Sequence, residues 1–134
     1  MTRPHARSIM GQIATGRTLA MAANAVNEND IPWGPHPRYE GLQMKVLVPG
    51  AVNPALNVSR VRVEVGKQIP PHVHAASSET FYILRGTGVC YLGDTPVPFG
   101  PGFCFYAPPG HEHRLENTGA EPVEILAVFA PPVA

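Results

Sequence analysis

Residues 66–86 of this chain, GKQIPPHVHAASSETFYILRG, contain the pattern that decides its fold. His72 and His74 are two residues apart, so on a β-strand their side chains point to the same face. Glu79 lies at the start of the next apolar run. The small residues before it predict a turn, which would place the Glu79 carboxylate beside the two histidines. Imidazole and carboxylate ligands suit divalent iron, manganese, zinc, nickel and copper. The stretch therefore predicts two adjacent strands that carry candidate metal ligands.

Residues 102–117, GFCFYAPPGHEHRLEN, contain a further candidate ligand, His113. The apolar residues 103–107 predict a strand, and the Pro-Pro-Gly sequence that follows predicts a tight turn. His111 precedes His113 by two residues and is a candidate general acid or base if it points toward the same cavity. The alternative is a rim or surface histidine, because side-chain parity is not fixed in a residue that follows a turn.

Short apolar runs separated by turn signals extend on both sides of these two stretches. Residues 60–65 alternate strictly between charged and apolar side chains, which indicates a strand with one buried face. Gly93-Asp94 is typical of a hairpin turn. Strands are expected over residues 42–48, 57–65, 80–84, 89–92, 103–107 and 123–129. Their regular spacing, with almost no helical periodicity after residue 40, indicates an all-β sandwich or barrel.

The composition agrees with this fold class and excludes several functions. The 134 residues include 13 Gly and 16 Pro, which interrupt helices and therefore oppose a helical bundle. Ten Lys and Arg balance ten Asp and Glu, so the chain lacks the basic surplus of a nucleic-acid-binding protein. No run approaches the ~18 apolar residues of a membrane span. Cys90 and Cys104 are too few for a disulfide framework and are expected to be buried free thiols.

Strand parity assigns the side chains around the candidate ligands. Phe81 and Ile83 share the parity of Glu79, so they should face inward, where they either line a mainly apolar substrate pocket or fill the barrel core. Arg60 and Arg62 alternate with valines and should lie on a solvated outer face, whereas an inward position would make either of them a carboxylate clamp.

Two apolar runs indicate a partner subunit. Residues 81–84 and 125–129 are apolar at both parities, so each run has a second face that a single barrel leaves uncovered. A second copy of the chain would cover these faces. We therefore expect a homodimer.

The N-terminal part of the chain differs from the rest. Residues 1–40 are expected to form a leader and an extended arm before a β-barrel domain of residues 41–134. The arm carries Trp33, His36 and Tyr39, which would cover the barrel mouth or pack on a partner subunit. We expect a cytoplasmic protein, with an N-terminal targeting segment as the alternative because three arginines precede the first acidic residue.

Both stretches resemble the two motifs of the cupin family. The first cupin motif is Gly, five residues, His-x-His, three or four residues, Glu, six residues, Gly; the second is Gly, five residues, Pro-x-Gly, two residues, His, three residues, Asn. Every defining position is filled in this chain, by Gly66, His72, His74, Glu79 and Gly86 and by Gly102, Pro108, Gly110, His113 and Asn117. The resemblance implies a small antiparallel jelly-roll barrel in which His72, His74, Glu79 and His113 bind one divalent metal ion.

The resemblance leaves the reaction open, because cupin folds host enzymes of many kinds as well as binding modules. We expect a metal-dependent enzyme whose small organic substrate chelates the metal through oxygen, and favour an oxidoreductase of the dioxygenase type. A metal-dependent isomerase, lyase or cyclase acting on a sugar-like or polyketide-like substrate is the first alternative. A cupin that binds a small molecule without turnover is the second.

Overall fold

The computed structural model of the chain describes residues 24–133, which include both motif stretches. The chain divides into two compact units, Met1–Pro32 and Trp33–Ala134. In the described part of the first unit, Glu28–Asp30 forms a 3-10 turn (η2), at whose start the Asn27 side chain accepts a hydrogen bond from the backbone of Asn29. The targeting segment weighed above lies outside the described residues. Within residues 24–133, no helix has the length and apolarity needed to cross a membrane.

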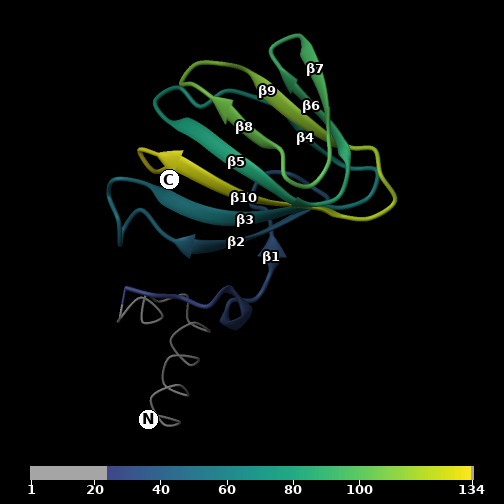
Figure 1. Cartoon of the computed structure of the whole chain (residues 1–134). Helices are drawn as coiled ribbons and strands as arrows, with labels where there is room; N and C mark the ends of the chain where they lie inside the picture. The colour runs from purple at the N-terminus through teal and green to yellow at the C-terminus, as the bar shows by residue number, and fades with distance from the viewer. Residues whose placement is uncertain (1–23, 134) are drawn as a thin grey trace. The chain divides into compact units, whose positions relative to one another are not determined.

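The described part of the second unit is a jelly roll of two antiparallel sheets (Figure 1). One sheet has the strand order β1-β2-β3-β10-β5-β8 and the other the order β4-β9-β6-β7. The strands are β1 (Gly34–Pro35), β2 (Leu42–Val48), β3 (Asn57–Val63), β4 (Gln68–His72), β5 (Ser78–Arg85), β6 (Gly88–Leu92), β7 (Thr95–Phe99), β8 (Cys104–Ala107), β9 (His113–Asn117) and β10 (Val123–Ala130). This architecture confirms the predicted all-β jelly-roll fold.

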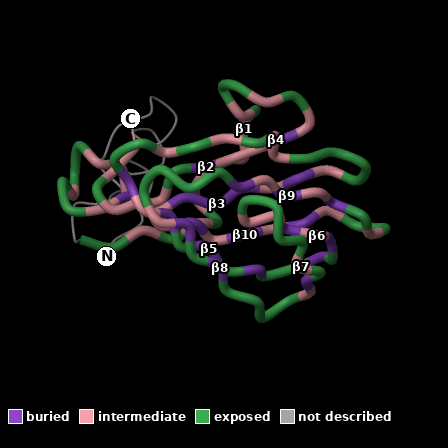
Figure 2. The backbone as a smooth tube through the Cα atoms, turned by 90° about the horizontal axis from the view of Figure 1, so that it is seen from above, coloured by how far each residue is buried: buried purple, intermediate pink, exposed green. Residues whose placement is uncertain are grey.

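The hydrophobic core lies on the inward faces of these strands, as the buried segments in Figure 2 show. Burial alternates along β5, where Phe81 and Ile83 are buried and their neighbours are exposed. Ile83 lies opposite Ile125 of β10, and Phe81 lies opposite Ala127. Each large apolar side chain buried in this way contributes about 1.5–3 kcal/mol. The barrel therefore has an apolar core that does not depend on the candidate metal ligands.

Asn117 shows why an Asn at the end of the second motif stabilises the fold. Its side-chain amide donates hydrogen bonds to the carbonyl oxygens of Val63 and Glu121, at 3.0 and 2.9 Å, and its oxygen accepts one from the Gly119 amide. These bonds hold the turn between β9 and β10 and join it to the end of β3. The role is structural, and it fixes the strand whose first residue is His113.

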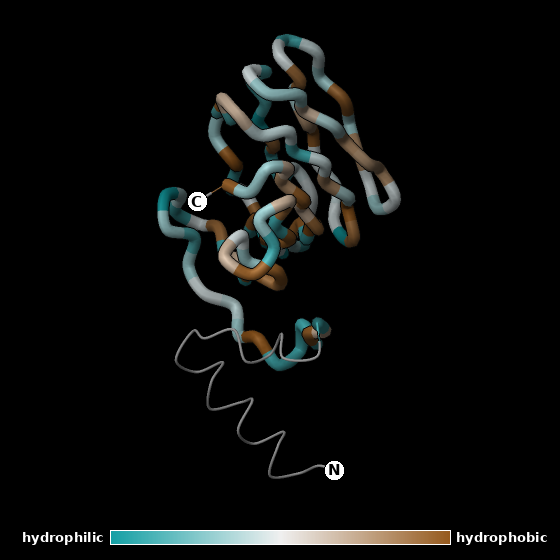
Figure 3. Tube along the Cα trace, turned by 90° about the vertical axis from the view of Figure 1, so that its left-hand side faces the viewer, coloured by the Kyte–Doolittle hydropathy of each residue, from teal (hydrophilic) through white to brown (hydrophobic). Residues whose placement is uncertain are grey.

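The outer face of the six-stranded sheet has an apolar part. Figure 3 shows that hydrophobic residues recur throughout the chain. Tyr82 and Leu84 of β5 point outward and are each 43% exposed. Leu126 and Val128, the outward residues of the neighbouring β10, are half-buried. The two runs that are apolar at both parities therefore lie side by side in one sheet, and their outward side chains share one face.

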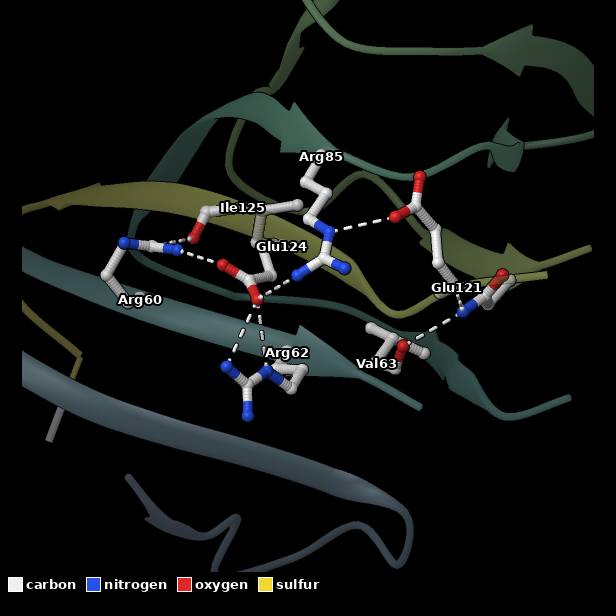
Figure 4. Close-up of polar contacts among 8 residues, drawn as sticks. Arg60, Arg62, Val63, Arg85, Glu121, Glu124 and Ile125 are labelled. Carbon is white, nitrogen blue, oxygen red and sulfur yellow. Dashed lines mark hydrogen bonds and ion pairs between the residues drawn. The ribbon is translucent and has the colours of Figure 1, made fainter. Parts of the chain in front are cut away.

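The charged part of the same outer face differs from the solvated strand that the sequence predicted. Arg60 and Arg62 do point away from the core, but Arg60 is only 7% exposed. Arg60 Nη2 lies 2.6 Å from Glu124 Oε1 and Arg62 Nη2 lies 3.1 Å from Glu124 Oε2 (Figure 4). The Trp33 ring covers both guanidinium groups, with Cζ-to-centroid distances of 5.4 and 4.4 Å. The alternating sequence pattern predicts correctly that these two side chains point outward. It does not predict that they are shielded from water, because the shielding comes from Trp33, which is distant in the sequence.

The two cysteines have different environments. Both are free thiols, as the sequence predicted, and Cys90 of β6 is buried. The expected burial of Cys104 is wrong, because it lies on the outward face of the edge strand β8 and is exposed.

Candidate metal centre

Three strands and the loop after one of them bring four polar side chains together inside the barrel. His72 ends β4 and lies opposite His113, which begins β9 in the same sheet. His74 follows β4 by two residues, and Glu79 lies in β5 of the other sheet. We call these four residues the histidine–glutamate cluster. Its members come from both sheets, so the closed jelly roll is what assembles it.

The four groups are close enough to share one ion. One ligating atom from each residue lies within 4.8 Å of the other three. Glu79 Oε1 lies 2.8 Å from His113 Nε2, 3.4 Å from His74 Nε2 and 4.0 Å from His72 Nε2. The structure thus gathers all four candidate ligands that the two motifs single out, with the Nε2 atoms of three imidazoles around one carboxylate oxygen.

Hydrogen bonds at Nδ1 hold the imidazoles of His72 and His113 in the tautomer that leaves Nε2 free to bind a metal. His72 Nδ1 lies 2.8 Å from the carbonyl oxygen of Pro70, and His113 Nδ1 lies 3.2 Å from that of His111. A carbonyl oxygen only accepts, so both Nδ1 atoms carry the hydrogen and both Nε2 atoms face the histidine–glutamate cluster. Within the described residues, His74 Nε2 is buried without a hydrogen-bond partner. A buried nitrogen of this kind is the orphaned group that a bound cation would satisfy.

Electrostatics in the histidine–glutamate cluster favour a positive charge at its centre. Burial opposes charge on His113, but the hydrogen bond and the negative charge of Glu79 outweigh it and raise the His113 pKa. Burial likewise opposes charge on Glu79, but His113 and His74 lower its pKa. Burial lowers the His72 pKa. A divalent metal ion at this centre would likewise be stabilised by the Glu79 carboxylate, and it would bind the imidazoles in their neutral form.

The donor set fits a divalent transition metal. Three neutral imidazoles and one carboxylate suit iron, manganese, zinc, nickel and copper, and they do not select among them. Four protein ligands leave room for a further oxygen ligand on metals that accept five or six. This further position is what distinguishes a reactive metal centre from a closed structural one.

A cavity of about 670 Å³ lies beside the histidine–glutamate cluster, and His72, His74 and Glu79 form part of its wall. Most of the remaining wall is apolar and comes from β2, β3, β4 and β10, through residues that include Leu42, Met44, Val61, Ile69, Ile125 and Phe129. Its volume lies within the range of ligand sites for small organic molecules. The arrangement can hold such a molecule with one end against the metal position.

Phe81 and Ile83 do not line this cavity, although both face inward as parity predicts. They belong to the core, where Phe81 stacks on Phe105 with ring centroids 5.2 Å apart. The Phe81 ring also lies 6.2 Å from the His113 ring and nearly parallel to it, so it supports His113 from the core side. Parity predicts which side chains enter a barrel, but depth along the barrel decides which of them reach the cavity.

His111 points away from the histidine–glutamate cluster. Its side chain is exposed and lies in a separate surface depression with Leu92, Tyr106 and Pro108. Only its carbonyl oxygen serves the cluster, as the acceptor for His113 Nδ1. The turn before His111 breaks strand parity, so the surface position weighed as the alternative agrees with the structure.

The cavity has polar wall residues that the motifs do not include. Tyr39 lies with its ring 6.3 Å from the His72 ring, and His36 stacks on Tyr39 at 4.8 Å, so this part of the expected arm does border the barrel mouth. Arg38, Asn57 and Ser59 also line the cavity, and sequence reasoning missed them. For Asn57 and Ser59 a signal existed, because both are polar residues at the inward parity of a strand.

The comparisons with known proteins agree with this geometry. The cupin domain family (Cupin_2) matches residues 59–129. The oxalate-binding protein of Thermotoga maritima is 34% identical over 77 residues, which are 58% of this chain and 64% of that protein. An uncharacterised protein of Methanocaldococcus jannaschii is 37% identical over 70 residues, 52% of this chain and 56% of that protein. The chain thus spans less than two thirds of the length of both curated relatives.

A solved structure resembles the barrel over most of its length. The crystal structure of a predicted oxalate decarboxylase from Thermotoga maritima superposes with a TM-score of 0.73 and 27% identity, covering 80% of this chain and 98% of that one. The polyketide cyclase RemF from Streptomyces resistomycificus superposes with a TM-score of 0.69 at 20% identity, covering 80% of this chain and 78% of that one, and shows the fold alone. Because the family match covers more than half of the sequence and the jelly roll carries both motifs, this chain belongs to the cupin family.

Proposed function

We propose that the protein is a divalent-metal-dependent enzyme of the dioxygenase type, acting with dioxygen on a small organic substrate that binds the metal through oxygen. The observation that carries this proposal is the histidine–glutamate cluster in the wall of a mainly apolar cavity. When bound, the metal supplies a Lewis acid and coordination positions for oxygen ligands. The three imidazoles and Glu79 stay in place as its ligands, and the apolar wall excludes water from the substrate.

A redox reaction is favoured over proton transfer because the cavity offers few groups that could act as a base. Outside the cluster, the titratable residues among the described part of its wall are His36, Arg38 and Tyr39. The Nδ1 atom of His36 accepts hydrogen bonds from the backbone amides of Arg38 and Tyr39, so its lone pair is already used. Burial, aided by the Arg38 charge, also lowers the His36 pKa. The other candidate base, His111, lies outside this cavity.

The second candidate is a metal-dependent isomerase, lyase or cyclase. It is supported by glucose-6-phosphate isomerase of Thermococcus gammatolerans, which is 39% identical over 64 residues, 43% of this chain and 33% of that protein. Tyr39 would then be the proton-transfer group, since its ring lies beside His72. The likeness to an oxalate-binding protein supports the third candidate, a cupin that binds a small molecule without turnover.

Oxygen uptake separates these candidates. The metal-loaded protein is screened with oxalate, catechol and acetylacetone, in air and without oxygen, together with Glu79→Gln and the exposed control Glu112→Gln. The proposal predicts oxygen consumption with a chelating substrate, a large loss in Glu79→Gln and none in Glu112→Gln. Equal turnover without oxygen would overturn the dioxygenase proposal in favour of the second candidate. Binding without any turnover would overturn it in favour of the third.

We also propose that the protein is a homodimer. The support is the outward apolar face of β5 and β8, where Tyr82, Leu84 and Tyr106 are 43%, 43% and 57% exposed. A second copy would bury this face, and a stable interface would bury more than roughly 1,000 Å² in total. Sedimentation that shows only monomers at micromolar concentration would refute the dimer.

The expected cytoplasmic location stays a prediction.

A further inference from the structure

The cavity beside the histidine–glutamate cluster has an uneven distribution of charge. Among its described wall residues, Glu79 and Arg38 are the only ones with a full charge at neutral pH. A divalent ion bound beside Glu79 would leave one positive charge at that end, and Arg38 adds another. The loaded cavity would therefore be positive at two separate places, and an anion would be attracted to it.

Arg38 is connected to the histidine–glutamate cluster through contacts of the Tyr39 ring. Its Cζ atom is 5.8 Å from the centroid of the Tyr39 ring, and that ring is 6.3 Å from the His72 ring. The Arg38 backbone is held in place because its amide donates to His36 Nδ1 at 3.1 Å. Apolar side chains, Met44 among them, form most of the rest of the wall. A molecule that reaches from the metal position to Arg38 would thus lie mostly against apolar surface.

Ser59 is a second, independent sign of a ligand in this cavity. It is 2% exposed, and it is a polar side chain in a wall that is otherwise mostly apolar. A hydroxyl in such a wall can donate or accept one hydrogen bond with a bound molecule. Its position on the inward face of β3, opposite Ala127, points it to something that enters the cavity.

We infer that the cavity binds an elongated, mainly apolar organic anion, with chelating oxygens at the histidine–glutamate cluster, a carboxylate near Arg38 and a polar contact to Ser59. The inference rests on the proposed function for its metal end and adds the class of substrate. Oxalate fits this class poorly, since it has no apolar body and would leave most of the 670 Å³ cavity unfilled.

Calorimetric titration of the zinc-loaded full chain tests the inference. The probes are 3-(3,4-dihydroxyphenyl)propanoate, which has a chelating end, an apolar ring and a carboxylate, its uncharged amide, and oxalate. Arg38→Gln should weaken binding of the acid about fivefold at low ionic strength and leave binding of the amide within about twofold. The control Arg85→Gln removes an exposed arginine outside the cavity wall and should change neither.

Ser59→Ala provides an independent measurement. Losing one hydrogen bond should weaken binding of both the acid and the amide about threefold to tenfold, and the zinc content should be unchanged. The inference is refuted if zinc binds but oxalate binds more tightly than the acid, or if Arg38→Gln affects acid and amide equally. If zinc itself does not bind, the proposed function fails and the chelating end of the inference fails with it.

Discussion

Glu124 holds the charged network on the outer face of the barrel, and replacing it with Gln should destabilise the fold measurably. Its side chain is 13% exposed, and its carboxylate contacts Arg60 at 2.6 Å and Arg62 at 3.1 Å. Arg60 is buried under Trp33, so the loss of its partner charge leaves a guanidinium with little access to water. Removing one partner of a buried pair is expensive because the remaining charge stays desolvated.

The size of the effect follows from these contacts. A charge-assisted hydrogen bond from the buried Arg60 is worth about 1.5–3 kcal/mol. The pair with the more exposed Arg62 adds about 0.2–1 kcal/mol. The amide oxygen of Gln restores one neutral bond of about 0.5–1 kcal/mol. The expected net loss is about 1.5–3 kcal/mol, which lowers Tm by about 5–12 °C in a domain of this size.

Thermal unfolding of Glu124→Gln beside Glu121→Gln measures this effect directly. Glu121 pairs with Arg85 at 2.9 Å, but both side chains are 53% exposed, so its loss should move Tm by no more than about 2 °C. Both variants remove one carboxylate from the same region, so their net charges are equal. If the two Tm values fall together, the outer-face network does not stabilise the barrel in the way described.

The remaining predictions concern the cluster, the cysteines and one turn. The raised pKa of His113 gives stability that is lost as pH rises above about 6.5, and the lowered pKa of Glu79 gives stability that is lost as pH falls below about 4.5. Glu79→Gln in the metal-free protein should therefore lower Tm most between these two pH values. A decrease in Tm that does not vary with pH would contradict this. Iodoacetamide should label the exposed Cys104 in the native protein and spare the buried Cys90, whose pKa is raised to about 12; native labelling of both, seen by mass spectrometry, would count against these assignments. Gly86→Ala should cost about 2–4 kcal/mol in urea unfolding, since φ is +92° and a Cβ atom would approach backbone atoms at 2.7 Å; a loss below about 1 kcal/mol would refute the strain.

The sequence predicted the parts of the fold that depend on local pattern. Alternation and turn residues predicted the strands, and the spacing of two motifs singled out the four members of the histidine–glutamate cluster, which the structure brings together. Three five-residue strands lie outside the expected strand ranges. Residues 68–72 of β4 contain two prolines, residues 95–99 of β7 alternate proline with other residues, and residues 113–117 of β9 are mostly polar, so none shows the apolar pattern of a strand. All three are strands because their neighbours in the sheet supply the hydrogen bonds.

Long-range packing decided what the sequence could not show. Arg60 is shielded by Trp33, which precedes β1 and lies far away in the chain. Cys104 is exposed because β8 is an edge strand and its outward face has no covering element among the described residues. Phe81 and Ile83 have the predicted direction, yet their depth in the barrel places them in the core. Periodicity gives the face of a strand, whereas shielding and depth depend on which elements pack against it.

The metal content of the purified chain is the most direct test of the histidine–glutamate cluster as a metal centre. Elemental analysis of protein prepared without chelators should find about one divalent transition-metal ion per chain. His74→Ala should lose most of the metal and keep the barrel folded, whereas His111→Ala, a histidine outside the cluster, should retain it. A wild-type chain without metal, or equal metal content in the two variants, would contradict the assignment of these four residues as ligands.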